Sequence, residues 1–285
     1  MAIHIGCGSW RDKEYVGLLF PKGVPETQRL SHYAKWFDRI ELNATYHAIP
    51  SAAQMAGWLA QTGPDFFFDV KFHQDFSKDP QAAARRPQRF RDAIAPLVEA
   101  GKLRAFLLTL SPSFGPQKHR LEELDGVAEA FGDVAPVAVE LRHRGWVEGE
   151  ARAATFAYLR ARRFAWVCTD LPRLDAPQIL PPLDEVTHPT LAYLRLHGRN
   201  PKYLEYSPDP KARHNYVYSE KELHEIAARI RHLATKAADV HVSVNTHYAD
   251  YAPRAALALR RLLGQPVPPP LSAASDDGSQ LSFLD

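Results

Sequence analysis

Eight short apolar segments of the sequence end in side chains that carry a charge, an amide, a hydroxyl or an aromatic ring. Carboxylates in such a set supply general bases, and lysine or histidine supplies a proton donor or an electrophile. The candidates for catalytic chemistry are Glu41, Lys71, Glu140, Asp170 and His197. A second set offers cations, amides and aromatic rings to a bound ligand, and it consists of Trp10, Asn43, Tyr46, Arg142, Arg195, Arg199, Asn245, His247 and Tyr248.

The alternation of residue types indicates why these side chains are expected to meet. Between residues 66 and 73, Phe66, Phe68 and Val70 would share one strand face, with Asp69 and Lys71 on the other, because strand side chains alternate in direction. Four other segments divide in the same way, around residues 40–43, 137–142, 194–197 and 240–247. Strands that are apolar on one face and polar toward their C-terminal ends predict a shared pocket at those ends.

The elements that position these residues alternate between strand and helix. Eight strands separated by helix-like segments favour a parallel α/β architecture, and this count favours a (β/α)8 TIM barrel forming a single domain over residues 1–264. An open doubly wound sheet is the alternative, but its central strands would be continuously apolar. The predicted strands are Ile3–Cys7, Arg39–Asn43, Phe66–Phe72, Leu103–Leu110, Pro136–Leu141, Phe164–Thr169, Leu191–Leu196 and Val240–Val244.

Start and stop signals mark several of the helices between these strands. Ser51 is a candidate N-cap, and Ser219 with Glu222 fits a capping box. Residues 175–189 contain four prolines and predict a loop or a short helix, and the long loop 197–218 predicts a lid over the pocket. The predicted helices are Thr27–Phe37, Ser51–Gln61, Gln88–Ala100, Lys118–Phe131, Glu150–Arg162, Ser219–Ala238 and Ala252–Leu263.

The C-terminal residues 265–285 differ in composition from the rest of the chain. Four prolines and several small or acidic residues between positions 265 and 277 predict an extended, flexible tail. Its last residues resemble the pentapeptide by which bacterial DNA polymerases and repair proteins dock on the sliding clamp. The alternatives are a chance match or packing back on the barrel. The proposed docking residues are Gln280, Leu281, Phe283 and Leu284.

Bulk composition narrows the classes of protein that fit the sequence. A net charge of +2 gives no argument for direct nucleic-acid binding. The expected location is the cytoplasm, with no role in a membrane, because no apolar run approaches the ~20 residues of a spanning helix. The two cysteines, Cys7 and Cys168, lie within predicted strands without a CxxC neighbour, which predicts buried thiols.

Four blocks of the sequence resemble the YecE-like family, the domain of unknown function 72. They are residues 41–50 (ELNATYHAIP), 137–146 (VAVELRHRGW), 195–199 (RLHGR) and 245–248 (NTHY), and together with Lys71 and the GCGSW segment they extend the likeness over about residues 3–262. Two positions depart from the family pattern: Thr246 replaces a second Asn, and residues 6–10 order their Gly, Ser and Trp differently. The resemblance implies a TIM barrel and implies no activity, cofactor or partner.

Two enzymatic hypotheses follow from the candidate residues. In the first, Arg142, Arg195 and Arg199 bind a small phosphate- or carboxylate-bearing ligand, sugar- or nucleotide-like. Glu41 or Glu140 would be the base, and Lys71 or His197 the acid or electrophile. The alternative to a catalytic role for Glu41 is a purely structural ion pair with Lys71 or Arg142.

The second hypothesis is a metal-dependent isomerase or phosphodiesterase linked to DNA metabolism. Glu41, Glu140, Asp170, His197 and His247 have the side-chain types that bind Mn, Mg or Zn. No HxH or HExxH spacing accompanies them, so the sequence requires no cofactor and leaves a divalent metal open.

Overall fold

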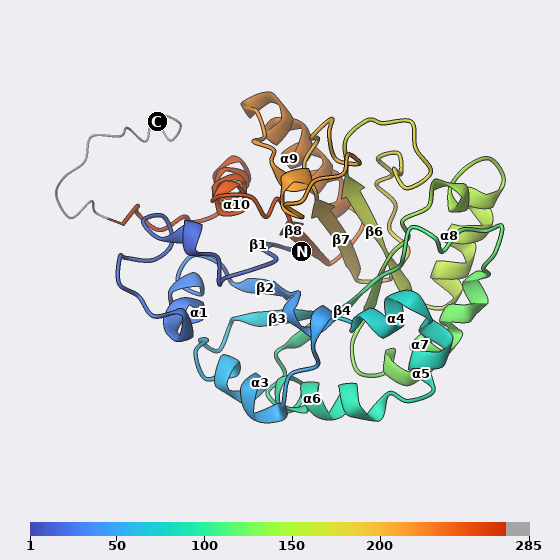
Figure 1. The fold of residues 1–285 in the computed structure, drawn as a ribbon, viewed down its shortest axis with the longest axis horizontal. Helices are drawn as coiled ribbons and strands as arrows, with labels where there is room; N and C mark the ends of the chain where they lie inside the picture. The colour runs from blue at the N-terminus through green and yellow to red at the C-terminus, as the bar shows by residue number, and fades with distance from the viewer. Residues whose placement is uncertain (272–285) are drawn as a thin grey trace.

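The chain folds into a ring of eight parallel strands surrounded by helices (Figure 1). A computed structural model describes residues 1–271, so the proposed docking residues Gln280, Leu281, Phe283 and Leu284 lie outside the described part. The predicted (β/α)8 barrel is confirmed. The strand order β1-β8-β7-β6-β5-β4-β3-β2 is sequential around the ring and has no switch point of the kind a doubly wound sheet requires. The strands are β1 (Ala2–Cys7), β2 (Arg39–Leu42), β3 (Phe67–Lys71), β4 (Leu103–Thr109), β5 (Val137–Glu140), β6 (Phe164–Asp170), β7 (Leu191–Leu196) and β8 (Asp239–Val244).

The helices form the outer layer of the barrel. The Ser51 side chain accepts a hydrogen bond from the Gln54 amide, and Ser219 and Glu222 form the expected capping box. Residues 171–190 contain neither helix nor strand, as the prolines predicted. The α-helices are α1 (Arg29–Tyr33), α2 (Ala44–His47), α3 (Ala52–Leu59), α4 (Gln74–Lys78), α5 (Pro80–Ala84), α6 (Gln88–Glu99), α7 (Asp125–Phe131), α8 (Ala151–Ala161), α9 (Glu220–Ala234) and α10 (Tyr251–Leu262).

Two of the predicted helices were wrong in extent. Residues 118–131 contain the 3-10 helix η3 (Leu121–Leu124) followed by α7, because buried residues three positions apart also fit a 3-10 turn. Residues 27–37 contain the end of η2 (Glu26–Gln28) and the short α1. Helices α2, α4 and α5 were not predicted, since four or five residues are too few to show a periodic pattern.

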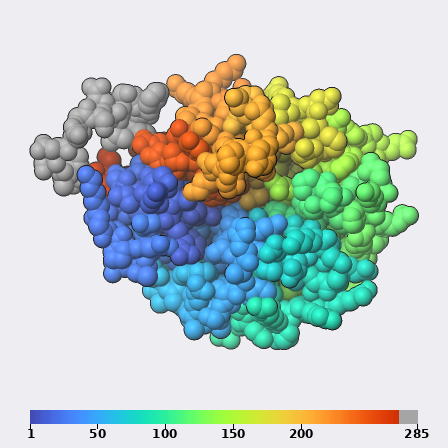
Figure 2. Space-filling model, viewed as in Figure 1, coloured from blue at the N-terminus to red at the C-terminus, as the bar shows by residue number. Residues whose placement is uncertain are grey.

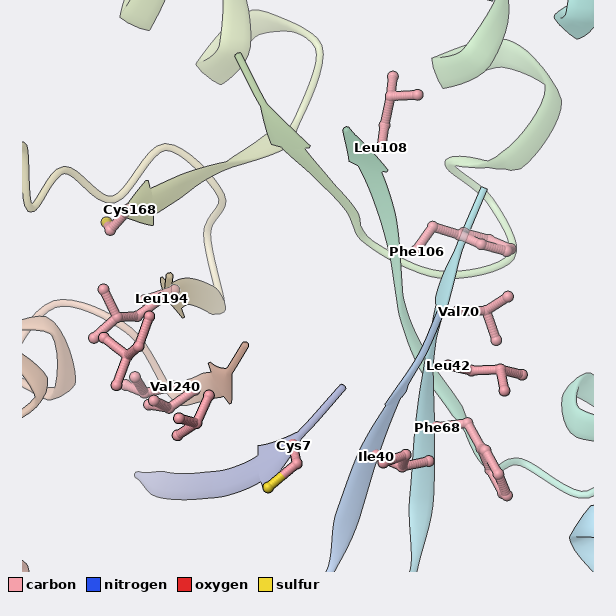
Figure 3. Packing of buried hydrophobic residues seen from close by; sticks show 14 of the residues in the cluster. Cys7, Ile40, Leu42, Phe68, Val70, Phe106, Leu108, Cys168, Leu194 and Val240 are labelled. Atoms are coloured by element: carbon pink, nitrogen blue, oxygen red, sulfur yellow. The ribbon is translucent and has the colours of Figure 1, made fainter. Parts of the chain in front are cut away.

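The two faces of the strands contribute to two different interiors. Apolar side chains such as Ile40, Leu42 and Phe68 lie on the outer side of the strands, within the core that packs against the helices (Figure 3). A smaller apolar cluster, which includes Ala105, Leu107, Ala138, Ala165, Val167, Leu191 and Tyr193, is contributed by β4 to β7. The charged side chains Arg39, Asp69 and Glu41 of β2 and β3 are fully buried, and two of them contact the Tyr193 hydroxyl of this cluster, so polar and apolar parts of the interior adjoin.

The ring closes between β1 and β2 without a ladder of backbone hydrogen bonds. The buried Tyr33 hydroxyl bridges this junction: it accepts from the Cys7 amide at 2.8 Å and donates to the Arg39 carbonyl at 3.0 Å. Gly6 is required here, because a Cβ at this position would lie 2.6 Å from the Arg39 carbonyl oxygen. The junction therefore depends on one tyrosine and one glycine.

Candidate functional site

The centre of the site is a buried arginine held between two carboxylates. Arg195, near the end of β7, donates from Nε and Nη2 to Glu41 on β2 at 3.0 and 2.7 Å. Its Nη1 donates to Glu140, the last residue of β5, at 2.5 Å. All three side chains are at most 3% exposed. A charge buried to this degree needs a counter-charge, and Arg195 supplies it to both glutamates at once.

Further contacts keep both glutamates ionised. Burial alone would raise the pKa of Glu41, but Arg195 and the Asn43 amide at 2.9 Å lower it to about 2. Burial also acts to raise the pKa of Glu140. Arg195 and His197 outweigh it, so the pKa of Glu140 lies well below its usual range. Carboxylates with pKa values this low are weak proton acceptors at neutral pH.

Lys71, at the end of β3, differs from every other charged group at this site. Its Nζ lies 4.0 Å from the centre of the Tyr46 ring, and within residues 1–271 its ammonium group forms no ion pair and no hydrogen bond. Burial, followed by the nearby charge of Arg195, lowers the pKa of Lys71 from 10.5 to about 7. Lys71 as a whole residue is partly exposed rather than fully buried.

The position of Tyr46 is set by a hydroxyl one residue earlier. Thr45 is fully buried and donates to the Leu42 and Lys71 carbonyls, which anchors helix α2 to the end of β3. This anchor places the Tyr46 ring against the Lys71 amine. An aromatic face attracts a cation but cannot neutralise its charge.

The formal charges of the site balance without Lys71. Arg142 lies 3.1 Å from Glu140, so two guanidinium groups, those of Arg142 and Arg195, face the carboxylates of Glu41 and Glu140. A protonated Lys71 is then a surplus charge, which its burial makes unfavourable. We call these five residues the mouth cluster.

A series of polar contacts extends the mouth cluster toward β8. His197 Nε2 lies 3.5 Å from Glu140, and its Nδ1 lies 3.2 Å from the Asn245 amide nitrogen. Asn245 Oδ1 in turn is 2.7 Å from His247 Nε2. Burial lowers the pKa of both histidines, that of His247 to about 4, so both rings are neutral at pH 7. Gly8 permits this packing, because its Cβ would lie 2.5 Å from the Asn43 amide nitrogen.

Asp170 and Arg199 lie apart from the mouth cluster. Asp170 shares the outward parity of Trp166 and Cys168 on β6, and it forms ion pairs with Arg199 at 2.9 Å and with Arg229 of α9 at 3.0 Å. Both arginines also line a cavity of about 680 Å³. Their guanidinium groups are already paired with carboxylates there. The sequence analysis grouped Asp170 with the pocket residues, although Asp170 follows Cys168 by two residues and therefore shares its outward direction.

The loop after β7 covers the mouth and brings in residues that the sequence analysis did not select. Lys211 lies 3.1 Å from Asp12, joining this loop to the segment after β1, and the two segments lie side by side in the space-filling view (Figure 2). The His214 ring lies 6.4 and 6.3 Å from those of His197 and His247. Tyr203 and Arg213 line a cavity of about 230 Å³ together with Glu140, Arg142 and Thr169. The composition of the loop suggested a lid, but nothing in it identified these side chains.

Trp10 and Tyr248 form part of the packing around the mouth. Trp10 is 4% exposed and makes an edge contact with Trp58 at 5.5 Å, while Tyr248 lies 5.8 Å from Tyr251. Neither ring contacts the mouth cluster through a recorded aromatic or hydrogen-bond interaction within residues 1–271.

A second charged group lies deeper in the barrel. Arg39 pairs with Asp69, which is 3.0 Å from His241 Nδ1, and Arg39 also donates to the Tyr193 hydroxyl at 3.0 Å. Arg39, Asp69 and Tyr193 are fully buried, and His241 is 4% exposed. We call these four residues the lower cluster. The Tyr193 hydroxyl also donates to Glu41 at 3.0 Å, so it links the lower cluster to the mouth cluster.

The side chains proposed as metal ligands are not arranged as a metal site. In the described part of the chain, no three His, Cys, Asp or Glu side chains are grouped so that they could hold a metal ion. Glu41 and Glu140 are held by Arg195, and Asp170 is held by Arg199 and Arg229. No helix in this part is both long and apolar enough to span a bilayer.

Fold and site together define a (β/α)8 barrel with a charged site at the C-terminal ends of its strands. The chain belongs to the protein family described as protein of unknown function DUF72, whose model matches residues 4–277. The likeness to the YecE-like family is thereby confirmed.

Relatives and solved structures agree with this family. The protein named YunF from Bacillus subtilis is 25% identical over 256 residues, which is 86% of this chain and 89% of that protein. YecE from Escherichia coli is 32% identical over 133 residues, 44% of this chain and 45% of that protein. A DUF72 family protein from Enterococcus faecalis has a similar structure with a TM-score of 0.84 and 25% identity, covering 96% of this chain and all of the other.

Proposed function

We propose that this protein is an enzyme that transfers protons on a small phosphate- or carboxylate-bearing ligand in the barrel mouth, with Lys71 as its acid–base group. The observation that carries the proposal is a partly exposed lysine without an ion-pair partner in residues 1–271, whose pKa is about 7. A group whose pKa lies near the working pH is present in both its protonated and its deprotonated form. It can therefore both release a proton to the ligand and accept one from it. Perturbed groups of this kind are concentrated at functional sites.

The glutamates support Lys71 rather than replace it. Glu41 and Glu140 remain ionised at neutral pH because Arg195 pairs with both of them. In this role they fix the position of Arg195. Burial is the largest cause of the lowered pKa of Lys71, and the charge of Arg195 is the second largest. We therefore assign the proton-transferring role to Lys71 and a positioning role to the two glutamates.

The anionic part of the ligand is assigned to Arg142 and Arg213. Both line the cavity of about 230 Å³ beside Glu140, and the Arg142 side chain is 33% exposed. Arg195 and Arg199 are less suited to this role, since their donors are already on carboxylates. Guanidinium groups with free donors bind phosphate or carboxylate well.

Two measurements test the proposal. Glycerol phosphate should raise the melting temperature of the wild-type protein and of the surface control Arg86→Met, but not that of Arg142→Met. The full chain should also exchange deuterium from D2O into carbon positions next to the carbonyl of small sugar phosphates, followed by NMR. Lys71→Met should reduce this exchange at least about 100-fold, the lower range for loss of an acid–base group. Stabilisation unaffected by Arg142→Met together with exchange at the background rate would contradict the proposal.

A further inference from the structure

We propose that Lys71 is also a nucleophile that forms an imine with ligands carrying an aldehyde or ketone beside an anionic group. This inference rests on the proposed function, because both place the ligand next to the Lys71 amine. It goes further by naming a carbonyl as the reacting group and a covalent bond as the intermediate. Lysine amines are activated for this reaction by desolvation or by a neighbouring cation, and Lys71 has both features.

The geometry around Lys71 leaves its nitrogen free to react. An amine held in an ion pair keeps its proton and has no available lone pair, whereas within residues 1–271 Lys71 has no such partner. The Tyr46 ring lies 4.0 Å from Nζ and Thr45 fixes the ring in place. The nitrogen is thus held on one side by an aromatic face.

The covalent step balances without a further reactant. The neutral Lys71 nitrogen attacks the carbonyl carbon, a C–N bond forms, and a proton passes from nitrogen to the former carbonyl oxygen. Protonation of this hydroxyl releases water and leaves an iminium ion. One amine, one carbonyl and one proton give one iminium and one water, with no oxidation or reduction.

The glutamates of the mouth cluster offset part of the cost of placing a positive charge on the Lys71 nitrogen. An iminium ion carries a fixed positive charge on the same nitrogen, and two carboxylates that stay ionised, Glu41 and Glu140, lie in the same cluster. Arg195 holds both carboxylates in fixed positions before the reaction, which is the arrangement that favours electrostatic assistance at a reacting group.

Reductive trapping tests the inference. The full chain is incubated with glyoxylate, which carries an aldehyde and a carboxylate, and sodium cyanoborohydride reduces any imine to a stable amine that peptide mass spectrometry locates. We expect Lys71 to be modified at least about tenfold faster than the exposed Lys22 at pH 7, because exposed lysines are ordinarily protonated at this pH. The rate at Lys71 should increase with pH and level off above about 7. Glycolate, which lacks the carbonyl, should compete without forming an adduct.

Two variants keep the result unambiguous. Lys71→Met should lose the adduct while keeping at least the wild-type melting temperature, and Lys22→Met should leave the adduct on Lys71 unchanged. Modification of Lys71 no faster than of Lys22 would overturn the inference. If deuterium exchange then persists, the proposed proton transfer stands and only the imine fails. An adduct on Lys71 without deuterium exchange would support the imine and contradict the proposed acid–base function.

Discussion

The lower cluster and the mouth cluster occupy the same barrel interior and both pair arginine with carboxylates, but they differ in charge balance. In the lower cluster, Arg39 pairs with Asp69, and both side chains are fully buried. In the mouth cluster, two arginines pair with two glutamates and Lys71 remains without a counter-charge. The lower cluster is thus closed to solvent and balanced, whereas the mouth cluster has two partly exposed members, Arg142 and Lys71, and a surplus amine.

The comparison shows that burying charged residues does not by itself make a functional site. Buried pairs such as Arg39 and Asp69 are costly to break but have no free group that could act on a ligand. Lys71 has the opposite properties, since it is partly exposed and its charged form is unfavourable. The following predictions test this difference.

The largest effect is expected in the lower cluster. Arg39→Met leaves the Asp69 carboxylate buried without its main partner, which should lower the free energy of unfolding by about 3–5 kcal/mol. Urea denaturation followed by circular dichroism measures this change, with Arg86→Met as the surface control expected within about 0.5 kcal/mol of wild type. A loss of less than about 1 kcal/mol for Arg39→Met would mean that the lower cluster is not a structural ion pair.

In the mouth cluster we expect a change in the free energy of unfolding of the opposite sign. Lys71→Met removes an amine without a counter-charge and adds an apolar side chain beside Tyr46, so the free energy of unfolding should stay the same or rise by about 1 kcal/mol. The same denaturation experiment measures it. Destabilisation as large as that of Arg39→Met would show that Lys71 is a structural cation and would remove the contrast between the clusters.

The stability difference between wild type and Lys71→Met should depend on pH. The pKa of Lys71 is about 7 in the folded protein, against 10.5 for a lysine in the unfolded chain. Between these two pH values the unfolded chain therefore binds more protons than the folded protein. The contribution of Lys71 to the free energy of unfolding therefore becomes more favourable as pH rises from about 7 to 10.5. Denaturation of both proteins at about pH 6.5, just below this window, and at about pH 8 and 9.5, within it, should show the stability advantage of Lys71→Met shrinking as pH rises. A constant difference would mean that the folded pKa of Lys71 is not lowered.

The smallest effect on the stability of the barrel is expected from changes in the C-terminal tail. We propose from the sequence that Gln280, Leu281, Phe283 and Leu284 bind the sliding clamp. Deleting residues 279–285 should abolish capture by immobilised clamp and leave the free energy of unfolding within about 0.5 kcal/mol of wild type. Replacing Leu281 and Phe283 by Ala in the full chain is the matched test. Equal capture of all three proteins would contradict the docking proposal.

The candidate site was only partly predictable from sequence. Alternation along β2, β3 and β7 correctly indicated that Glu41, Lys71 and Arg195 face the same interior, because the direction of a strand side chain follows from its parity. The same parity argument, applied to β6, would have separated Asp170 from them. Helices of four or five residues, such as α2, left no periodic signal, although α2 carries the ring that contacts Lys71.

The sequence by itself determined the strands, their polar faces and the barrel that they form, since these depend on side-chain patterns within short segments. Only the tertiary structure decided which charges are paired. Glu41 and Arg195 are 154 residues apart, and neither residue type nor spacing indicated that one arginine would hold both glutamates. The lowered pKa of Lys71 arises from burial and from charges on other strands. Such long-range terms exist only when the ring has closed, which is why the reactive amine became apparent only in the folded chain.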